Sequence, residues 1–253
     1  MPPLYVSLTS IYQNQRLLLK TLESLKTQTL RPQAVEIFLS EEPYLVDQGF
    51  KNRAISEPEL TIFLNTNMSL FKVNWVPNTG PYRKLLPILK EKWTEDCLIV
   101  SVDDDTCYHP NLLENLLADY NTHRCVVNYR GFTPALTKLA DLDYNKKASL
   151  FPKYLYNFPT GKAGILYHPA FFHNTGELIF DQTIYLDTCK TADDIWFALI
   201  RILNGIECYL DDKPYMVRDM TVPERPLYNT YNAGDKNTES IKDTLKRLGL
   251  ITG

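Results

Sequence analysis

The sequence has 253 residues, of which 44% are hydrophobic, so it can bury one large domain or one domain with a small appendage. Its formal net charge is −3, and no basic excess points to a nucleic-acid partner. The five cysteines are odd in number and form no C-x-x-C pair, which argues against a disulfide framework or a structural zinc site and favours a reducing, cytoplasmic compartment. No run reaches the roughly 18 apolar residues of a membrane span and no signal peptide is recognisable, so we expect no transmembrane segment.

The beginning of the chain predicts a strand, a helix and a second strand. Residues 4–8 form a short apolar run of β-prone side chains. Residues 15–27 carry leucines at spacings of four and three, which is the stripe of an amphipathic helix. Pro32 interrupts the chain, and residues 34–39 follow as a second apolar strand. A unit of this kind is typical of a parallel α/β sheet.

The next part of the chain is less regular. Residues 41–67 form a long connection of mixed polarity that the pattern does not assign, and loops of this length are often functional. Residues 71–76 alternate in polarity as a strand does. Residues 81–92 have helical spacing but contain Pro87, so this helix is expected to be kinked or to start late. Residues 97–102 are apolar, β-branched and bounded by acids, which makes them the most convincing strand.

Helices and strands continue to the C-terminus, although the periodicity weakens after Gly131. The expected elements are helices over 111–120, 192–204 and 240–248 and strands over 124–128, 165–167 and 207–210. Gly205 is placed to end the second of these helices.

This pattern predicts one domain followed by a tail. Residues 1–222 are expected to form the domain, with a nucleotide-binding half over about 1–130 and an acceptor half over about 131–222. Residues 223–253 form a polar C-terminal tail with a short helix. The tail carries Tyr228, Tyr231 and Asp235, and it either closes over a ligand or packs on the surface.

Three consecutive carboxylates, Asp103, Asp104 and Asp105, follow the strand at 97–102. They repel one another, and a bound divalent cation removes that cost because Mg²⁺ and Mn²⁺ prefer hard oxygen ligands. Ligands also gather at the carboxyl ends of strands in open parallel sheets. The alternative is an exposed acidic turn that caps the next helix. The position after a buried strand favours the metal site.

Two other turns are weaker indications of a ligand site. Arg83 and Lys84 lie where a turn enters a helix. One interpretation is that they contact phosphate together with the helix amides, and the other is that they are two solvated basic residues. Gly161 and Gly164 precede the strand at 165–167, where glycine allows close approach to a ligand or only a bend in the chain.

Asp193 and Asp194 lie in the first turn of the helix expected over 192–204, with Thr191 as a suitable N-cap. The helix dipole favours anions there, and this structural role is sufficient for one of the two. Because adjacent carboxylates on a helix point in different directions, the other is available to face a cleft. It would act there as a general base on an acceptor hydroxyl.

Taken in this order, the segments resemble the GT-A glycosyltransferases, especially their inverting, family-2-like group. The matching parts are the opening strand and helix end at residues 6–10, 22–29 and Pro32, the D-x-D motif at 103–105, the glycine-bearing acceptor-side loop at Gly161 and Gly164, and the E-D motif at 192–196. The resemblance covers about residues 4–210. It implies a Rossmann-like α/β fold in a single domain, with a mixed, mostly parallel sheet flanked by helices.

The resemblance also implies roles for single residues. Expected at the donor are Thr9 and Glu41 near the nucleotide base, Lys84 at the base or phosphates, and Asp103 near the ribose, with Arg83 and Asp104 as further donor-binding residues. Asp105 and Asp103 are the expected ligands of Mn²⁺ or Mg²⁺. Asp194 is the expected catalytic base, and Gly161, Gly164 and Trp196 are expected on the acceptor side. Asp193 stands where the family has Glu, so the two carboxylates could exchange roles.

The implied reaction moves a single sugar from a nucleotide-sugar donor, a UDP-sugar first and a GDP-sugar second, to a hydroxyl of a glycan or glycoconjugate, with inversion. The Q-x-x-R-W motif of processive synthases is absent, in line with a single transfer by a soluble enzyme. A nucleotidyltransferase is one alternative, but residues 9–16 lack the glycines of its phosphate loop. A non-catalytic carbohydrate-binding protein is the other, although both acidic pairs remain.

Overall fold

In the computed structural model, which describes residues 2–136, 138–220 and 234–252, the strands form one large sheet and two small ones. The large sheet contains β1 (Leu4–Thr9), β2 (Ala34–Leu39), β3 (Phe71–Trp75), β4 (Leu98–Ser101), β6 (Val126–Asn128), β8 (Lys153–Tyr154), β10 (Ile165–Tyr167) and β11 (Cys208–Leu210). The small sheets pair β5 (Thr106–Tyr108) with β12 (Val217–Asp219) and β7 (Gly131–Phe132) with β9 (Phe158–Pro159).

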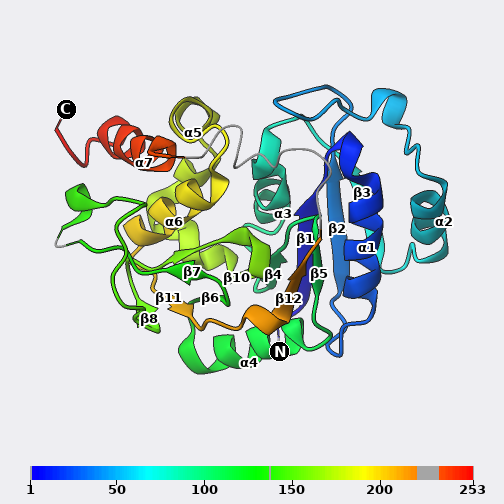
Figure 1. Ribbon diagram of the computed structural model, residues 1–253, viewed down its shortest axis with the longest axis horizontal. Coiled ribbons are helices and arrows are strands. Elements are labelled where there is room, and N and C mark those ends of the chain that lie inside the picture. The colour runs from blue at the N-terminus through cyan, green and yellow to red at the C-terminus, as the bar shows by residue number, and fades with distance from the viewer. Residues whose placement is uncertain (1, 137, 221–233, 253) are drawn as a thin grey trace.

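The large sheet has the strand order β3-β2-β1-β4-β10-β6-β11-β8 (Figure 1). The first four strands of that order run parallel to one another, and β11 runs parallel to β6. β10 lies antiparallel between β4 and β6, and β8 is antiparallel to β11. The expected single α/β domain with a mixed, mostly parallel sheet is confirmed.

Helices flank this sheet. They are α1 (Gln15–Lys26), α2 (Pro58–Thr66), α3 (Leu86–Glu91), α4 (Leu112–His123), α5 (Gln182–Thr188), α6 (Asp193–Leu203) and α7 (Lys236–Arg247). α1 and α2 lie at the end of the molecule that carries β3, whereas α5, α6 and α7 gather at the opposite end (Figure 1). β12, in contrast, returns from the second half of the chain to lie beside β5 (Figure 1).

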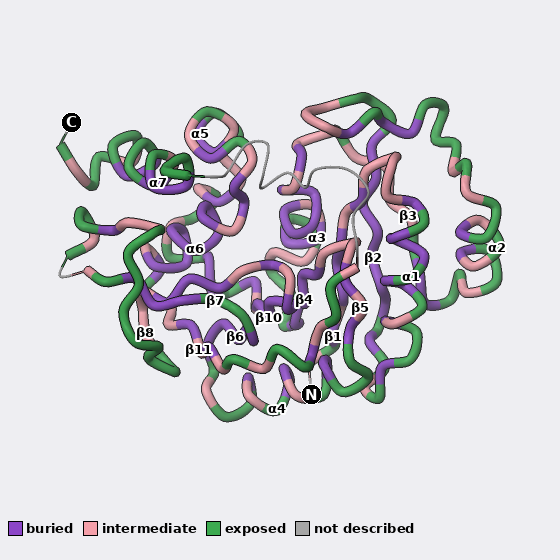
Figure 2. The backbone as a smooth tube through the Cα atoms, viewed as in Figure 1, coloured by how far each residue is buried: buried purple, intermediate pink, exposed green. Residues whose placement is uncertain are grey.

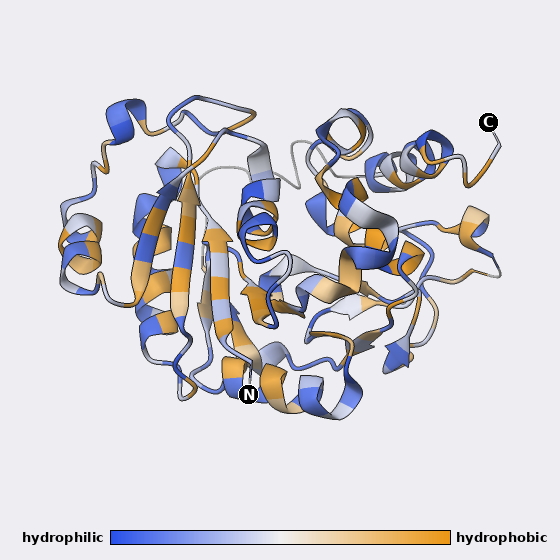
Figure 3. Cartoon of the chain, turned by 180° about the vertical axis from the view of Figure 1, so that it is seen from behind, coloured by the Kyte–Doolittle hydropathy of each residue, from blue (hydrophilic) through white to orange (hydrophobic). Residues whose placement is uncertain are grey.

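The sequence pattern explains which faces are buried. All six residues of β2 are buried, as expected for an apolar strand in the middle of a parallel sheet (Figure 2). Leu18 and Leu22 of α1 are fully buried, while Lys20 on the other side of the helix is exposed. Figure 3 shows the same division in the helices, which carry both apolar and hydrophilic residues. Each fully buried leucine contributes about 1.5–3 kcal/mol to folding.

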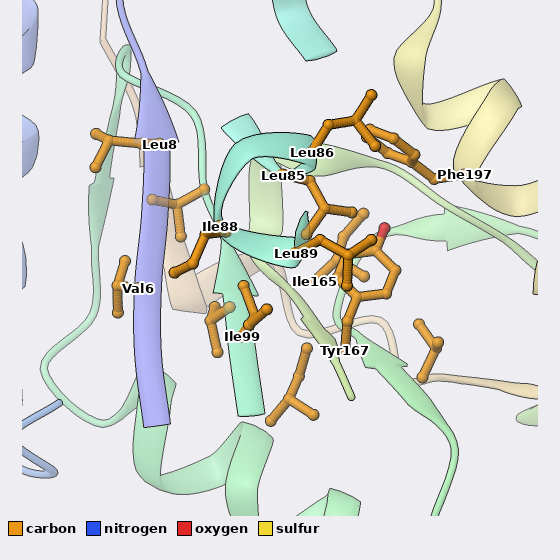
Figure 4. Packing of buried hydrophobic residues seen from close by; sticks show 14 of the residues in the cluster. Val6, Leu8, Leu85, Leu86, Ile88, Leu89, Ile99, Ile165, Tyr167 and Phe197 are labelled. Carbon is orange, nitrogen blue, oxygen red and sulfur yellow. The ribbon is translucent and has the colours of Figure 1, made fainter. Parts of the chain in front are cut away.

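α3 is the link between the sheet and the second half of the chain. Figure 4 shows its side chains against those of three strands and of α6; the labelled residues are Val6, Leu8, Leu85, Leu86, Ile88, Leu89, Ile99, Ile165, Tyr167 and Phe197. This packing fixes the turn just before α3, the end of β4 and the start of α6 relative to one another.

A buried ion pair joins the segment after β2 to the turn before α3. Arg83 Nη2 lies 3.0 Å from Asp47 Oδ2, and the two side chains are 1% and 2% exposed. Arg83 Nη1 donates to Ser40 Oγ at 2.7 Å. Asp47 also accepts from the backbone amide of Tyr12 at 3.0 Å and from the side-chain amide of Asn78 at 3.1 Å. These bonds fasten the loop after β2 onto the ends of β1 and β3.

Several elements differ from the sequence-based expectation. The unassigned residues 41–67 contain α2, which the pattern did not indicate because Leu60 and Leu64 are its buried residues and the others give no stripe. The helix expected over 81–92 starts late, at Leu86, with Pro87 in its first turn, where the missing amide hydrogen costs little. α5 was not expected at all.

The C-terminal helix packs on the body of the protein. α7 begins at Lys236, earlier than the expected residue 240, and buries Ile241 and Leu245. Thr244 Oγ1 donates to Thr188 Oγ1 of α5 at 2.8 Å. Of the tail residues singled out above, Asp235 precedes α7, whereas Tyr228 and Tyr231 lie outside the described residues. Across the described chain, every helix is too short or too polar to cross a bilayer.

The substitution Asp47→Ala should lower the free energy of unfolding by about 3–5 kcal/mol, because Arg83 would stay buried without its counter-charge. Urea unfolding at pH 7 measures this change. Glu207→Ala removes the same charge from an exposed pair with Lys153, and it should cost about 0–1 kcal/mol. Equal losses in the two variants would contradict a special role for the buried pair.

Candidate active site

The two acidic motifs of the sequence meet at one lysine. Lys84 Nζ lies 3.3 Å from Asp103 Oδ1, 2.9 Å from Asp193 Oδ2 and 3.2 Å from Asp194 Oδ1. The lysine side chain is only 7% exposed. The contact between Lys84 and Asp194 joins residues that are 110 positions apart in the chain.

Regular structure fixes each member of this cluster. Asp103 follows the end of β4, and Asp193 and Asp194 are the first two residues of α6. Lys84 ends the 3₁₀ turn Gly80–Lys84 directly before α3, and its backbone carbonyl accepts from Ser7 Oγ of β1 at 2.6 Å. The cluster therefore lies at the carboxyl ends of the central parallel strands, where ligands bind in open α/β sheets.

Gly161 completes the cluster from the loop before β10. Its backbone amide donates to Asp194 Oδ2 at 2.9 Å. A Cβ atom at this position would lie 2.5 Å from Lys84 Nζ and 3.0 Å from Asp103 Oδ1, so any side chain here would have to displace the lysine ammonium. Gly164 has a different requirement, a φ of +73°, because the chain turns there into β10.

Charge is unevenly balanced around Lys84. Burial alone would lower the pKa of its ammonium, but the charges of Asp103, Asp193 and Asp194 together raise that pKa well above its ordinary value. Burial raises the pKa of Asp193 to about 7, against the attraction of Lys84. One positive charge faces three carboxyl groups, and the site as a whole attracts cations.

The three carboxylates of the acidic turn do not act alike. Asp104 points inward and accepts from Ser10 Oγ and, at 3.2 Å, from the side-chain amide of Asn14. Burial raises its pKa to about 7. Burial and the charge of Asp103 raise the pKa of Asp105, and the charge of Lys162 opposes this shift. These two hydrogen bonds hold Asp104 against the segment after β1, and its place among the donor-binding residues stays a prediction.

A divalent cation fits Asp103 and Asp105 if phosphate oxygens of a substrate supply further ligands. The described residues contain no preformed group of three or more His, Cys, Asp or Glu side chains that could hold a metal. Magnesium is nevertheless bound in many enzymes by one or two carboxylates together with phosphate oxygens of the substrate. Asp103 and Asp105 lie close enough for one charge to raise the pKa of the other, which is the cost that a cation removes.

The two acids of α6 differ in exposure. The side chain of Asp193 is 8% exposed and that of Asp194 is 29% exposed. Asp194 is therefore the one that a second molecule can reach. The N-cap residue of α6 is Ala192, so the expected cap at Thr191 is wrong, and the dipole of α6 is met by the two carboxylates themselves.

Two expected site residues lie in the interior instead. Arg83 is 1% exposed and its guanidinium is occupied by Asp47 and Ser40, so it does not face a donor. Trp196 is fully buried and its indole donates to the backbone carbonyl of Ile179 at 2.9 Å, which makes it a core residue of α6 rather than part of an acceptor surface.

A groove of about 600 Å³ lies beside the ends of β2 and β3. Its lining residues are Glu41, Glu42, Lys51, Asn52, Arg53, Trp75, Val76 and Pro77. Arg53 lies over the Trp75 ring at 5.9 Å and pairs with Glu41 at 3.3 Å. Glu41 thus lines a groove, whereas Thr9 Oγ1 donates to the carbonyl of Phe38 at 2.7 Å, and the expected place of both near a nucleotide base stays a prediction. Sequence reasoning missed Trp75 and Arg53, although Trp75 lies in the strand predicted over 71–76.

Comparison with known proteins gives a fold relationship. No family model matches the sequence, and no curated protein matches it. The crystal structure of S. aureus TarS 1-349 in complex with UDP-GlcNAc has a TM-score of 0.55 and 14% identity, covering 91% of this chain and 62% of that chain. The complex of TarS 1-349 with UDP has a TM-score of 0.53 and 15% identity, covering 87% of this chain and 61% of that chain.

The chain therefore matches less than two thirds of the length of these TarS structures. At such low identity the likeness shows the fold, and the expected GT-A fold is confirmed.

The substitution Asp104→Asn should stabilise the protein more at pH 8 than at pH 5. A carboxyl whose pKa rises to about 7 on folding binds its proton more tightly in the folded state, so its contribution to stability falls as the pH rises from about 4 to 7. The amide variant has no charge to bury, and its gain at pH 8 is at most about 4 kcal/mol, since one pKa unit corresponds to about 1.4 kcal/mol.

Urea unfolding of both proteins at the two pH values, with EDTA present, checks this. Parallel pH dependence in the wild type and the variant would show that Asp104 does not carry the effect.

Proposed function

We propose that this chain is a glycosyltransferase that moves a single sugar from a nucleotide-sugar donor to a hydroxyl of a glycan or glycoconjugate. The observation that carries the proposal is the convergence of Asp103 and Asp194 on Lys84 and Gly161 at the carboxyl ends of the strands. In the proposed reaction, Asp103 would face the donor and Asp194 would face the acceptor. The fold shared with TarS supports the proposal, because TarS 1-349 has been crystallised with UDP and with UDP-GlcNAc.

The groove beside Glu41 is the proposed place for the nucleotide base. Its volume of about 600 Å³ is in the range of ligand pockets. Trp75 and Arg53 offer flat surfaces for a planar ring, and Glu41 offers a hydrogen-bond acceptor. A UDP-sugar is the first choice of donor, in keeping with the TarS complexes, and a GDP-sugar is the second.

Asp103 and Asp105 are the proposed ligands of Mn²⁺ or Mg²⁺. A cation held there would neutralise charge on the donor diphosphate and on the departing nucleotide. Asp104, which faces Ser10, would keep the turn in shape so that its two neighbours face the donor.

Asp194 is the proposed general base. Its carboxylate would take the proton from the acceptor hydroxyl while the hydroxyl oxygen attacks the anomeric carbon. The bond from that carbon to the diphosphate oxygen breaks, its electron pair leaves with the nucleoside diphosphate, and the configuration inverts. Gly161 and Lys84 would hold the carboxylate in position, since each contacts a different oxygen of Asp194. Asp193 is the more buried acid and would hold Lys84.

The two rival functions are less well supported. The segment after β1 contains no glycine and forms the short 3₁₀ helix Tyr12–Asn14, so it lacks the phosphate loop of a nucleotidyltransferase. A non-catalytic carbohydrate-binding protein has no need of the accessible Asp194 held by a backbone amide.

The substitution Asp194→Asn should lower the turnover number by about 10²–10⁴-fold, because an amide cannot accept the acceptor proton. Donor affinity should change little. Steady-state transfer assays and donor titrations separate the two effects. Asp187→Asn, at an exposed position of α5, is the matched control and should behave like the wild type. An inactive Asp193→Asn beside an active Asp194→Asn would exchange the roles of the two acids.

Thermal shifts with UDP-, GDP-, dTDP- and CMP-sugars, with and without Mn²⁺, test the donor site, since ligand binding raises stability by mass action. We expect a Mn²⁺-dependent rise in Tm with one nucleotide family. Asp105→Ala should abolish the Mn²⁺ dependence. The absence of any shift with every donor would count against the transferase, and a shift that ignores Mn²⁺ would remove the metal from the proposal.

A further inference from the structure

Lys162 is a cation beside the acidic turn that the proposed reaction has not used. It follows Gly161 in the loop before β10, and its Nζ lies 3.0 Å from Asp219 Oδ2 at the end of β12. The side chain of Lys162 is 25% exposed and that of Asp219 is 64% exposed. Exposed pairs of this kind are weak and exchange readily.

Contacts on both sides of the acidic turn fix the positions of Lys162 and Asp219. On one side, Gly161 lies against Asp103: a Cβ atom added to the glycine would be 3.0 Å from Asp103 Oδ1. On the other side, Asp219 pairs in register with Thr106, and the next amide, of Met220, donates to the carbonyl of Asp105 at 3.1 Å. The side chain of Lys162 therefore reaches across the turn that runs from Asp103 to Thr106.

The balance of charge indicates what Lys162 could bind. A divalent cation at Asp103 and Asp105 would already be matched by two carboxylates, and Lys84 already contacts three. The diphosphate of a nucleotide-sugar carries two negative charges and gains a third when the sugar leaves. Lys162 is paired with one exposed carboxylate, so its charge is available for exchange at little cost.

We propose that Lys162 is a diphosphate-binding residue and that Asp219 is the carboxylate it leaves when a donor binds. This inference rests on the proposed function and adds to it a specific contact on the leaving group. Because Asp219 competes with the diphosphate for the same ammonium, it lowers donor affinity in the resting protein. Removing the competitor should strengthen binding, which a purely structural pair would not do.

Calorimetric titration with UDP and with uridine, both in Mn²⁺, tests the exchange. Lys162→Met should weaken UDP binding about tenfold, the value of one charge-assisted hydrogen bond, and leave uridine binding unchanged. Lys162→Arg keeps the charge and should bind UDP within about threefold of the wild type. Asp219→Asn should bind UDP about two- to fivefold more tightly, since an exposed ion pair no longer has to break.

The double variant Lys162→Met with Asp219→Asn separates exchange from a general change of charge. The gain from Asp219→Asn should vanish in it, because the ammonium for which the two groups compete is gone. Glu207→Gln and Lys153→Met alter in the same way an exposed pair between β8 and the residue before β11, and they should leave UDP affinity unchanged.

Three results would overturn the inference. UDP affinity that is unchanged in Lys162→Met would do so while leaving the proposed function intact. A gain from Asp219→Asn that persists without Lys162 would also do so, because it would reflect net charge alone. If the wild-type protein binds no nucleoside diphosphate at all, the proposed function fails together with this inference.

Discussion

The ammonium of Lys84 is the interaction on which the arrangement of the site depends. Three carboxyl groups from two distant segments lie within 3.3 Å of it, and in its absence they would face one another across a poorly solvated space. Buried like charges are costly unless a counter-charge and hydrogen bonds accompany them. One nitrogen thus determines how close the end of β4 comes to the start of α6. It also explains why the loop before β10 approaches with a glycine, since any side chain would displace that nitrogen.

The sheet topology makes this meeting possible. The parallel strands β3, β2, β1 and β4 deliver their carboxyl ends to one edge, which places the acidic turn and the groove on the same side. Antiparallel β10 then enters beside β4 from the opposite direction, so the loop before it arrives at that edge as well. The second half of the chain thereby supplies Gly161 and Asp194 to a cluster whose other members, Lys84 and Asp103, belong to the first half. Arg83, the residue before Lys84, pairs with Asp47 and so holds the loop after β2 in place.

Local pattern was sufficient for seven of the eight strands of the large sheet, most helices and both acidic motifs, whereas β8 and the strands of the two small sheets were not predicted. The apolar run before Asp103 and the helix that starts at Asp193 are visible in the sequence because their periodicity is strong. Partners far apart in the chain were not visible. Adjacent basic residues look alike in sequence, yet Arg83 faces Asp47 and Lys84 faces the site, a difference that only tertiary packing decides. Trp196 was misplaced for the same reason, because an aromatic residue beside an acid can lie on either face of a helix.

The separation in sequence of the groups around Lys84 has a consequence for how the molecule is made. Its contact with Asp194 spans 110 residues, and loop closure over such a distance delays the contacts that depend on it. On a ribosome, the strands up to β4 and their helices are synthesised well before α6 appears. Until then Lys84 has Asp103 but neither acid of the second motif, and the buried corner that α6 fills is open to water. The nascent chain therefore completes the parallel strands up to β4 first, and the cluster around Lys84 forms among the last events of folding.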